Sequence, residues 1–307
     1  MSHELLLSGL DGANPLGFLA ALGTLRTVNR AASEYKPELF WCVEDGAWRP
    51  ILQTAAELSP DILIAKLHDA LKQMKDHDTW ALGDNLNVAP AVFRSYAQKA
   101  ACNAHPDGSI HAEFAAAFAS EAVIETMPGK DAVVSDTALR TMSGAGHQHF
   151  IGFMRQLVEL TNADHIANAL FSTWRYDDQK PSLRWDPEDD RRYALRWNEP
   201  SGDPIKTVRG ANRLAIEALP LLPVMPRMGK LETTDFATAG SSHTYWTWPI
   251  WNHAIGIDVV RSLLADKRLC KPAENSQSLS RIGVCTLFRS QRLTVGKYRN
   301  FTMGVPV

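Results

Sequence analysis

Residues 9–17 read Gly-Leu-Asp-Gly-Ala-Asn-Pro-Leu-Gly and separate two apolar stretches of different periodicity. Before them, residues 4–10 form a short apolar run that predicts a strand. After them, leucines recur at helical spacing toward Arg30, which predicts a helix. Asn14 suits the N-cap of that helix, and Pro15 suits its first position, where a missing N–H costs nothing. The chain therefore opens with a strand, a glycine-rich turn and an apolar helix that we expect to belong to the core.

The remaining periodicity predicts an α+β fold in two parts. The first part, residues 1–173, is expected to be helix-rich with a short N-terminal sheet. Its elements are a strand over 39–43 that turns at Asp45 and Gly46, and helices over 60–74, 91–104, 110–122, 150–160 and 166–171. The second part, residues 174–307, is expected to be mixed and to end in a β-hairpin. Its elements are helices over 210–219 and 257–265 and strands over 245–251, 282–288 and 298–305.

Two further features of the sequence bear on this division. The character of the chain changes near residues 173–180, which we take as the domain boundary. Residues 271–280 are polar, and we expect them to be a mobile segment.

Charge is unevenly distributed along the 307 residues, although the whole chain carries a net charge of only -2. Residues 261–307 contain nine basic and two acidic residues, a net of +7, which leaves -9 for residues 1–260. A basic segment on an acidic body suggests a polyanionic partner. The four cysteines are dispersed, the N-terminus does not resemble a signal peptide, and no apolar run reaches 18 residues. We therefore expect a cytoplasmic protein without a membrane span.

Possible catalytic or metal-binding groups occur in three places, and each has a simpler structural interpretation. The glycine-rich turn at 9–17 matches neither the P-loop nor the dinucleotide pattern, so a tight turn is favoured over a phosphate site. His147 and His149 lack a convincing third ligand. The acidic run at 186–190 is flanked by arginines, which favours ion pairing over the two-metal site of a nuclease. No cofactor is expected, and the chain is more easily explained as a non-enzyme.

The best candidates for nucleic-acid contact lie in the second part of the chain. Trp246 and Trp248 would share one face of a strand and could stack on unpaired bases, although tryptophan more often belongs to a core. Basic side chains interleaved with aromatic ones fit a phosphate-binding hairpin near the C-terminus. The residues of this basic tail are Arg281, Arg289, Arg292, Lys297 and Arg299. Arg209 and Arg213, at a predicted helix start, form a second and weaker candidate.

Four segments resemble a known group of proteins. Residues 10–23 read Leu-Asp-Gly-Ala-Asn-Pro-Leu-Gly-Phe-Leu-Ala-Ala-Leu-Gly, and residues 183–195 read Leu-Arg-Trp-Asp-Pro-Glu-Asp-Asp-Arg-Arg-Tyr-Ala-Leu. Residues 210–212 add Gly-Ala-Asn, and residues 217–220 add Glu-Ala-Leu-Pro. Together these segments resemble proteins encoded with type I-G (formerly I-U) CRISPR systems, either the large subunit or a smaller accessory subunit.

The resemblance implies a non-enzymatic role in RNA-guided DNA binding. The implied partners are the other subunits of a CRISPR effector complex and the guide RNA or target DNA, and recognition of target DNA is the implied task. Two alternatives come from the residues themselves. One is a metal-dependent nuclease that uses the acidic run with His147 or His149, and the other is a protein-interaction module without nucleic-acid contact.

Overall fold

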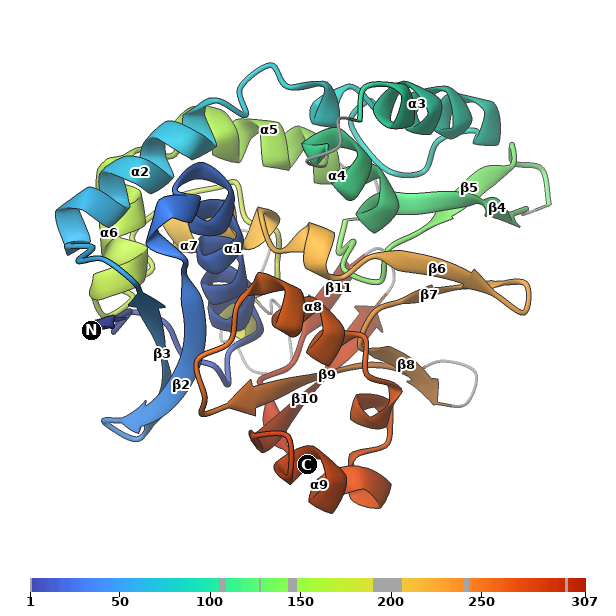
Figure 1. The fold of residues 1–307 in the computed structure, drawn as a ribbon. Helices are drawn as coiled ribbons and strands as arrows, with labels where there is room; N and C mark the ends of the chain where they lie inside the picture. The colour runs from blue at the N-terminus through green and yellow to red at the C-terminus, as the bar shows by residue number, and fades with distance from the viewer. Residues whose placement is uncertain are drawn as a thin grey trace, which may run out of the picture.

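The computed structural model of the chain describes residues 2–104, 109–126, 128–142, 148–189, 206–239, 243–295 and 298–307. Most of its helices lie in the upper half of the view in Figure 1, and its strands run along the lower and right-hand sides. The mixture of helices with several small sheets confirms the predicted α+β class.

The N-terminal sheet is antiparallel and has the order β1-β3-β2. Its strands are β1 (His3–Leu6), β2 (Glu38–Glu44) and β3 (Ala47–Thr54). Asp45 and Gly46 join β2 to β3 with positive φ angles of 51° and 74°, as a two-residue hairpin turn of this hand requires. The turn was predicted, whereas β3 itself was not.

Helix α1 (Pro15–Ala31) follows the glycine-rich turn, as predicted. The side chain of Asn14 caps it by accepting hydrogen bonds from the amides of Leu16 (2.8 Å) and Gly17 (3.3 Å). Every residue from Pro15 to Val28 is buried, which is the pattern of a helix surrounded by other elements. α1 is therefore the central helix of the fold.

The other helices largely match the predicted positions, and most of them lie above and beside α1 in Figure 1, whereas α9 lies at the bottom of the view. They are α2 (Pro60–Lys72), α3 (Pro90–Cys102), α4 (Ile110–Phe118), α5 (Phe150–Leu160), α6 (Ala163–Phe171), α7 (Arg209–Ile216), α8 (Ile257–Leu264) and α9 (Pro272–Ser280).

One predicted helix is too long, and one helix was not predicted. The helix expected over 110–122 ends at Phe118, and the chain continues as β4 (Ala119–Glu125), which pairs with β5 (Val133–Asp136). The β-branched residues of β4 and β5 pair across the strands and override the alanine-rich helical pattern. The segment expected to be mobile at 271–280 is helix α9, which starts at Pro272 and is anchored by the buried Leu279.

The C-terminal sheet has the strand order β11-β10-β9-β8, with β12 also paired to β10. Its strands are β8 (Phe236–Ala239), β9 (His243–Trp251), β10 (Val284–Val295), β11 (Tyr298–Phe301) and β12 (Val305–Pro306). β10 and β11 form the terminal hairpin that was predicted, although β10 is longer than expected. A separate hairpin of β6 (Val224–Arg227) and β7 (Lys230–Thr233) was not predicted.

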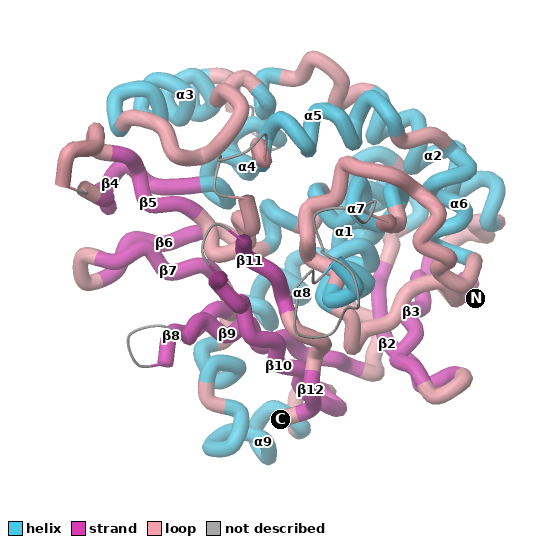
Figure 2. The backbone as a smooth tube through the Cα atoms, turned by 180° about the vertical axis from the view of Figure 1, so that it is seen from behind, coloured by secondary structure: helices cyan, strands magenta, loops and turns pink. Residues whose placement is uncertain are grey.

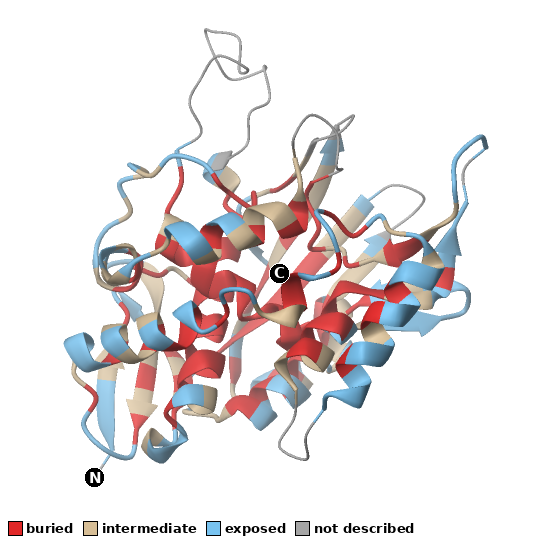
Figure 3. Cartoon of the chain, turned by 90° about the horizontal axis from the view of Figure 1, so that it is seen from above, coloured by how far each residue is buried: buried red, intermediate tan, exposed pale blue. Residues whose placement is uncertain are grey.

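One hydrophobic core takes side chains from both predicted parts of the chain. The ring of Phe18 on α1 lies with its centroid 5.7 to 6.4 Å from those of Trp41, Trp246, Trp248 and Trp251. Figure 3 shows the buried residues running through the middle of the molecule, between the helices and the sheets. The two sides of the boundary expected near residues 173–180 therefore do not form separate cores. None of the helices described is both long and apolar enough to cross a membrane.

Candidate nucleic-acid interface

Trp246 and Trp248 lie in the core, so the prediction that they stack on bases is wrong. Both are 0% exposed. They point from the same face of β9 toward α1, and the indole N–H of Trp248 donates to the carbonyl of Gly12 at 2.8 Å. Burial of their large apolar area against Phe18 outweighs any surface role.

Arg213 is also fully buried, so the prediction that it contacts nucleic acid is wrong. Its guanidinium pairs with Glu217, four residues later at the C-terminal end of α7, at 2.9 Å, and donates to the carbonyl of Leu71 at 3.3 Å. Arg209, at the start of the same helix, is half-buried and interacts with His165 on α6 (3.0 Å). Its predicted contact with nucleic acid stays a prediction.

The basic tail is divided between separate places on the C-terminal sheet. Arg281 is exposed in the turn before β10, and Arg292 lies near the other end of this 12-residue strand. Arg289 lies on the opposite face of β10 from Arg292, because side chains alternate along a strand. Lys297 lies outside the described residues. The predicted arginines therefore do not form one continuous surface.

Arg289 is held against its own sheet. Its Nε donates to the hydroxyl of Thr247 on β9 at 3.0 Å, and its guanidinium lies 5.8 Å from the ring centre of Tyr245. Both contacts fix the side chain along β9 and leave it half-buried.

Arg292 and Arg299 come together with a third arginine that sequence reasoning missed. Arg140 lies in the loop after β5 and pairs with Asp136, four residues earlier, at 2.7 Å. Arg292 donates to the carbonyl of Ala138 (2.8 Å), and Arg299 donates to the carbonyl of Arg140 (3.3 Å). We call Arg140, Arg292, Arg299 and Asp136 the arginine cluster. Seen from behind, β11, the strand of Arg299, lies beside the ends of β5, β6 and β7 (Figure 2).

Positive charge exceeds negative charge in the arginine cluster. The cluster holds three guanidinium groups and one carboxylate. Glu125 lies near enough to raise the pKa of Arg299, and if it is counted, three cations still face two carboxylates. Burial, with repulsion from Arg299 and Arg140, lowers the pKa of Arg292 to about 10. Burial and the nearby Arg140 also lower the pKa of Arg299. Each lowered pKa means that keeping these arginines charged in the fold costs free energy. A bound anion would reduce this cost, because an opposite charge favours the charged form.

Some donors of the cluster have no partner in the fold. The Nε atoms of Arg140 and Arg292 are buried and have no hydrogen-bond partner among the residues that the structure describes. Guanidinium groups bind phosphate with paired N–H donors. Because these Nε atoms are buried, a phosphate oxygen would be met by the terminal nitrogens of the half-buried Arg292 and Arg299.

No signal in the sequence near Arg140 points to this site. The loop that carries it is placed by long-range contacts: the amide of Ala138 donates to the hydroxyl of Thr233 (2.8 Å), and the hydroxyl of Thr141 donates to the carbonyl of Leu183 (2.6 Å). These partners lie about 40 to 95 residues away along the chain.

The glycine-rich turn at 9–17 is a structural turn and not a phosphate site. Gly12 is buried, and a Cβ atom added there would lie 2.8 Å from Ile250 and 2.9 Å from Trp41. The first amides of α1 already donate to Asn14, so they are not available to a ligand. The option of a phosphate contact at this turn is therefore wrong.

The acidic run does not present a metal site in the part of the chain that the structure describes. Asp186 is buried and accepts hydrogen bonds from the side chain of Asn14 (3.1 Å) and the amide of Glu188 (3.1 Å). No group of three His, Cys, Asp or Glu side chains gathers as metal ligands do among the described residues. His147, Asp190 and the side chain of Asp189 lie outside them.

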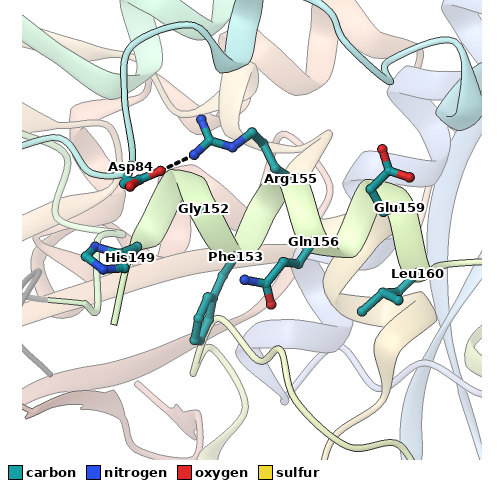
Figure 4. Close-up of a pocket in the computed structure, with 8 residues that line it drawn as sticks. All are labelled: Asp84, His149, Gly152, Phe153, Arg155, Gln156, Glu159 and Leu160. Atoms are coloured by element: carbon teal, nitrogen blue, oxygen red, sulfur yellow. Dashed lines mark hydrogen bonds and ion pairs between the residues drawn. The ribbon is translucent and has the colours of Figure 1, made fainter. Parts of the chain in front are cut away.

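His149 borders a hollow of about 520 Å³ along α5, drawn in Figure 4. Its charged lining is paired within the protein, because Arg155 bonds to Asp84 and Glu159 accepts from Lys75 at 2.9 Å.

The segments that carry the family resemblance meet in space. Asn14 donates to Asp186, the side-chain oxygen of Asn212 accepts from the amide of Leu183 (2.9 Å), and α1 packs on α7. The indole N–H of Trp185 donates to the carbonyl of Leu139 (2.9 Å), next to Arg140. Comparison of the chain with protein-family models, with curated proteins and with solved structures finds no match.

Proposed function

We propose that this chain is a non-catalytic subunit of a type I-G (I-U) CRISPR interference complex in the cytoplasm. In this role the arginine cluster binds phosphates of the guide RNA or the target DNA. The other subunits of the complex and the nucleic acid are its partners. The observation that carries the nucleic-acid part of the proposal is the excess of positive charge in the arginine cluster.

The scaffold of the cluster supports the link to the CRISPR proteins. Residues 183–186, part of a segment that carries the resemblance, bond to the loop of Arg140 through Trp185 and through the carbonyl of Leu183. The same segment bonds to Asn14 in the first segment and to Asn212 in the third. The residues that resemble the family therefore build the support of the proposed site.

Phosphate binding through the cluster can be measured as a salt dependence. The full chain is titrated against labelled single-stranded RNA and duplex DNA at several salt concentrations. Each phosphate contact contributes about 0.7 (single strand) or 0.9 (duplex) to the slope of log affinity against log salt. Replacing Arg292 and Arg299 together by Gln is expected to flatten the slope by roughly 1.4 to 1.8.

Two further variants control this experiment. Arg94→Gln removes an exposed arginine on α3, far along the chain from the cluster, and should leave the slope unchanged. The double substitution Arg292→Lys and Arg299→Lys keeps the charge but not the paired donors, so it should keep the slope and lose part of the affinity. Melting temperatures show whether each variant is folded. An unchanged slope in a folded Gln variant would contradict the site, and Mg²⁺-dependent cleavage by the wild type would contradict the non-catalytic role.

A further inference from the structure

The β6–β7 hairpin extends from the fold beside the arginine cluster. Its last residue, Thr233, accepts a hydrogen bond from the amide of Ala138, whose carbonyl in turn accepts from Arg292. The hydroxyl of Thr234 fixes the other side of the base by donating to the carbonyl of Pro223 (2.8 Å). From this base the hairpin projects at the right of Figure 1, next to β4 and β5. The hairpin and the cluster are thus parts of one connected support.

The tip of the hairpin carries an unusual residue. Met228 and Gly229 form a two-residue turn with φ angles of 47° and 74°, where Asn, Asp or Gly is the usual choice at both positions. A bulky apolar residue in this left-handed conformation is uncommon, and such conformations concentrate at functional sites. Met228 is also 94% exposed, so packing within the fold does not account for it.

The chemistry around the tip indicates the class of ligand. Arg227 and Lys230 flank the turn and are exposed, so an apolar side chain projects between two basic residues, of which Arg227 also lies 3.6 Å from the carboxylate of Glu232. A DNA duplex has the complementary arrangement, with apolar stacked bases between two negatively charged phosphate backbones. Proteins that deform nucleic acid insert apolar side chains, Met included, between base steps. Four residues of strand at about 3.3 Å each place the tip roughly 13 Å from the hairpin base, about four base steps of a duplex.

We propose that Met228 inserts between adjacent bases of a DNA duplex whose phosphates are held by the arginine cluster. This inference rests on the proposed function, because it assigns the same nucleic acid to both parts. A protein partner that adds a strand to the hairpin is less favoured. Pro226 lacks the N–H that a strand added along β6 would need.

Base unstacking can be read directly with permanganate, which oxidises thymines that are not covered by a neighbouring base. The full chain is bound to a DNA duplex of mixed sequence, and the affinity is measured in parallel by fluorescence anisotropy. Met228→Asn keeps a residue that accepts the left-handed conformation but removes the apolar side chain. Met225→Thr, in the same hairpin but away from the tip, is the matched control.

Wild type and Met225→Thr are expected to raise thymine oxidation severalfold on binding. Met228→Asn is expected to return it to the level of free duplex while the affinity changes by less than about threefold, since unstacking costs much of what insertion gains. Binding without added oxidation in the wild type would overturn the insertion alone, and loss of a co-purifying protein on Met228→Asn would then assign the tip to a protein partner. Absence of binding to the duplex would overturn both this inference and the proposed site.

Discussion

At the scale of single residues, Asp235 shows how the fold holds an ionisable group. It lies in the turn between β7 and β8 with a positive φ of 65° and is buried. Its Oδ2 atom has no hydrogen-bond partner among the residues described. Burial raises the pKa of Asp235 well above its ordinary value of 3.8, and the nearby Asp266 raises it further. The fold therefore favours the neutral, protonated carboxyl group.

The raised pKa of Asp235 predicts how stability depends on pH. The unfolded chain releases the proton of Asp235 near pH 3.8, whereas the folded chain retains it to higher pH. The contribution of Asp235 to stability is therefore complete below that pH. It falls as the pH rises toward the folded pKa, by about 1.4 kcal/mol for each pH unit that separates the unfolded and folded pKa values. Asp235→Asn, which also accepts a positive φ, should unfold at higher urea than wild type at pH 7 and at equal urea near pH 3.5. If wild type and Asp235→Asn unfold at the same urea concentration at pH 7 as well as at pH 3.5, the pKa of Asp235 is not raised in the folded chain.

Glu217 lies at the centre of a buried ion-pair network between α1 and α7. It accepts from Arg26 and from Arg213, both at 2.9 Å, and is 0% exposed. Burial acts to raise the pKa of Glu217, but Arg213, Arg26 and Arg30 together outweigh it and hold the pKa below 4.5. Arg26 also bonds to Glu113 on α4, which is 31% exposed and pairs with Arg261 on α8.

The two glutamates give a matched pair of substitutions. Glu217→Gln leaves the buried Arg213 without a carboxylate and leaves Arg26 with Glu113 alone, so it should lower the unfolding free energy by about 3–5 kcal/mol at pH 7. Glu113→Gln changes a partly exposed pair and should cost about 1 kcal/mol or less. Because the pKa of Glu217 is lowered, its contribution is present above pH 4.5 and is lost as the pH falls below it. Urea unfolding at pH 7 and pH 3 measures the free energy that each variant loses and how this loss depends on pH. Equal losses for Glu217→Gln and Glu113→Gln at pH 7 would show that burial does not determine the strength of these ion pairs.

At the scale of elements, the contact between α1 and α7 depends on a single glycine. A Cβ atom at position 23 would lie 1.8 Å from the carbonyl oxygen of Leu214 on α7. An alanine there would force apart two helices that carry the buried ion pairs and the segments of the family resemblance.

Gly23→Ala is therefore expected to destabilise the protein by at least about 3 kcal/mol, beyond the gain in helix propensity. Gly152→Ala on α5 is the control, because the nearest neighbour of its Cβ would be the Cβ of His149 at 3.1 Å, a contact that a shift of a few tenths of an ångström relieves. Its effect should stay within about 1 kcal/mol of wild type. Thermal melts of the two variants decide this, and a Gly23→Ala protein as stable as Gly152→Ala would mean that the helices are not in close contact.

Elements that combine local signals were predicted well, and those that depend on distant partners were not. α1 could be predicted because Asn14, Pro15 and the spacing of its leucines all indicate the same start and the same helix. β4 and β6 were missed because their short sequences become strands only through pairing with β5 and β7. A helix-like run such as the one before β4 cannot reveal this by itself.

At the scale of the whole molecule, the candidate site shows the same limit. Charge counting along the sequence identified Arg292 and Arg299, because both lie in the basic C-terminal segment. It could not identify Arg140, which reaches them only through the bonds of its loop to Thr233 and Leu183. The sequence also could not show whether Trp246 and Trp248 are buried or exposed. The alternation of side chains along β9 is the same whether these tryptophans belong to the core or contact a ligand.

The single core also decides how the molecule should unfold. Side chains from before residue 173 and after residue 174 share it, through Phe18 with Trp248 and through α1 with α7. We expect one cooperative transition in urea, with the same midpoint by tryptophan fluorescence and by far-ultraviolet circular dichroism. A fragment of residues 1–173 alone would leave α1 without α7 and without β9, so it should show no cooperative transition. Two separated transitions, or a cooperatively folded fragment, would instead mean that the change in sequence character near residues 173–180 marks two independently stable domains.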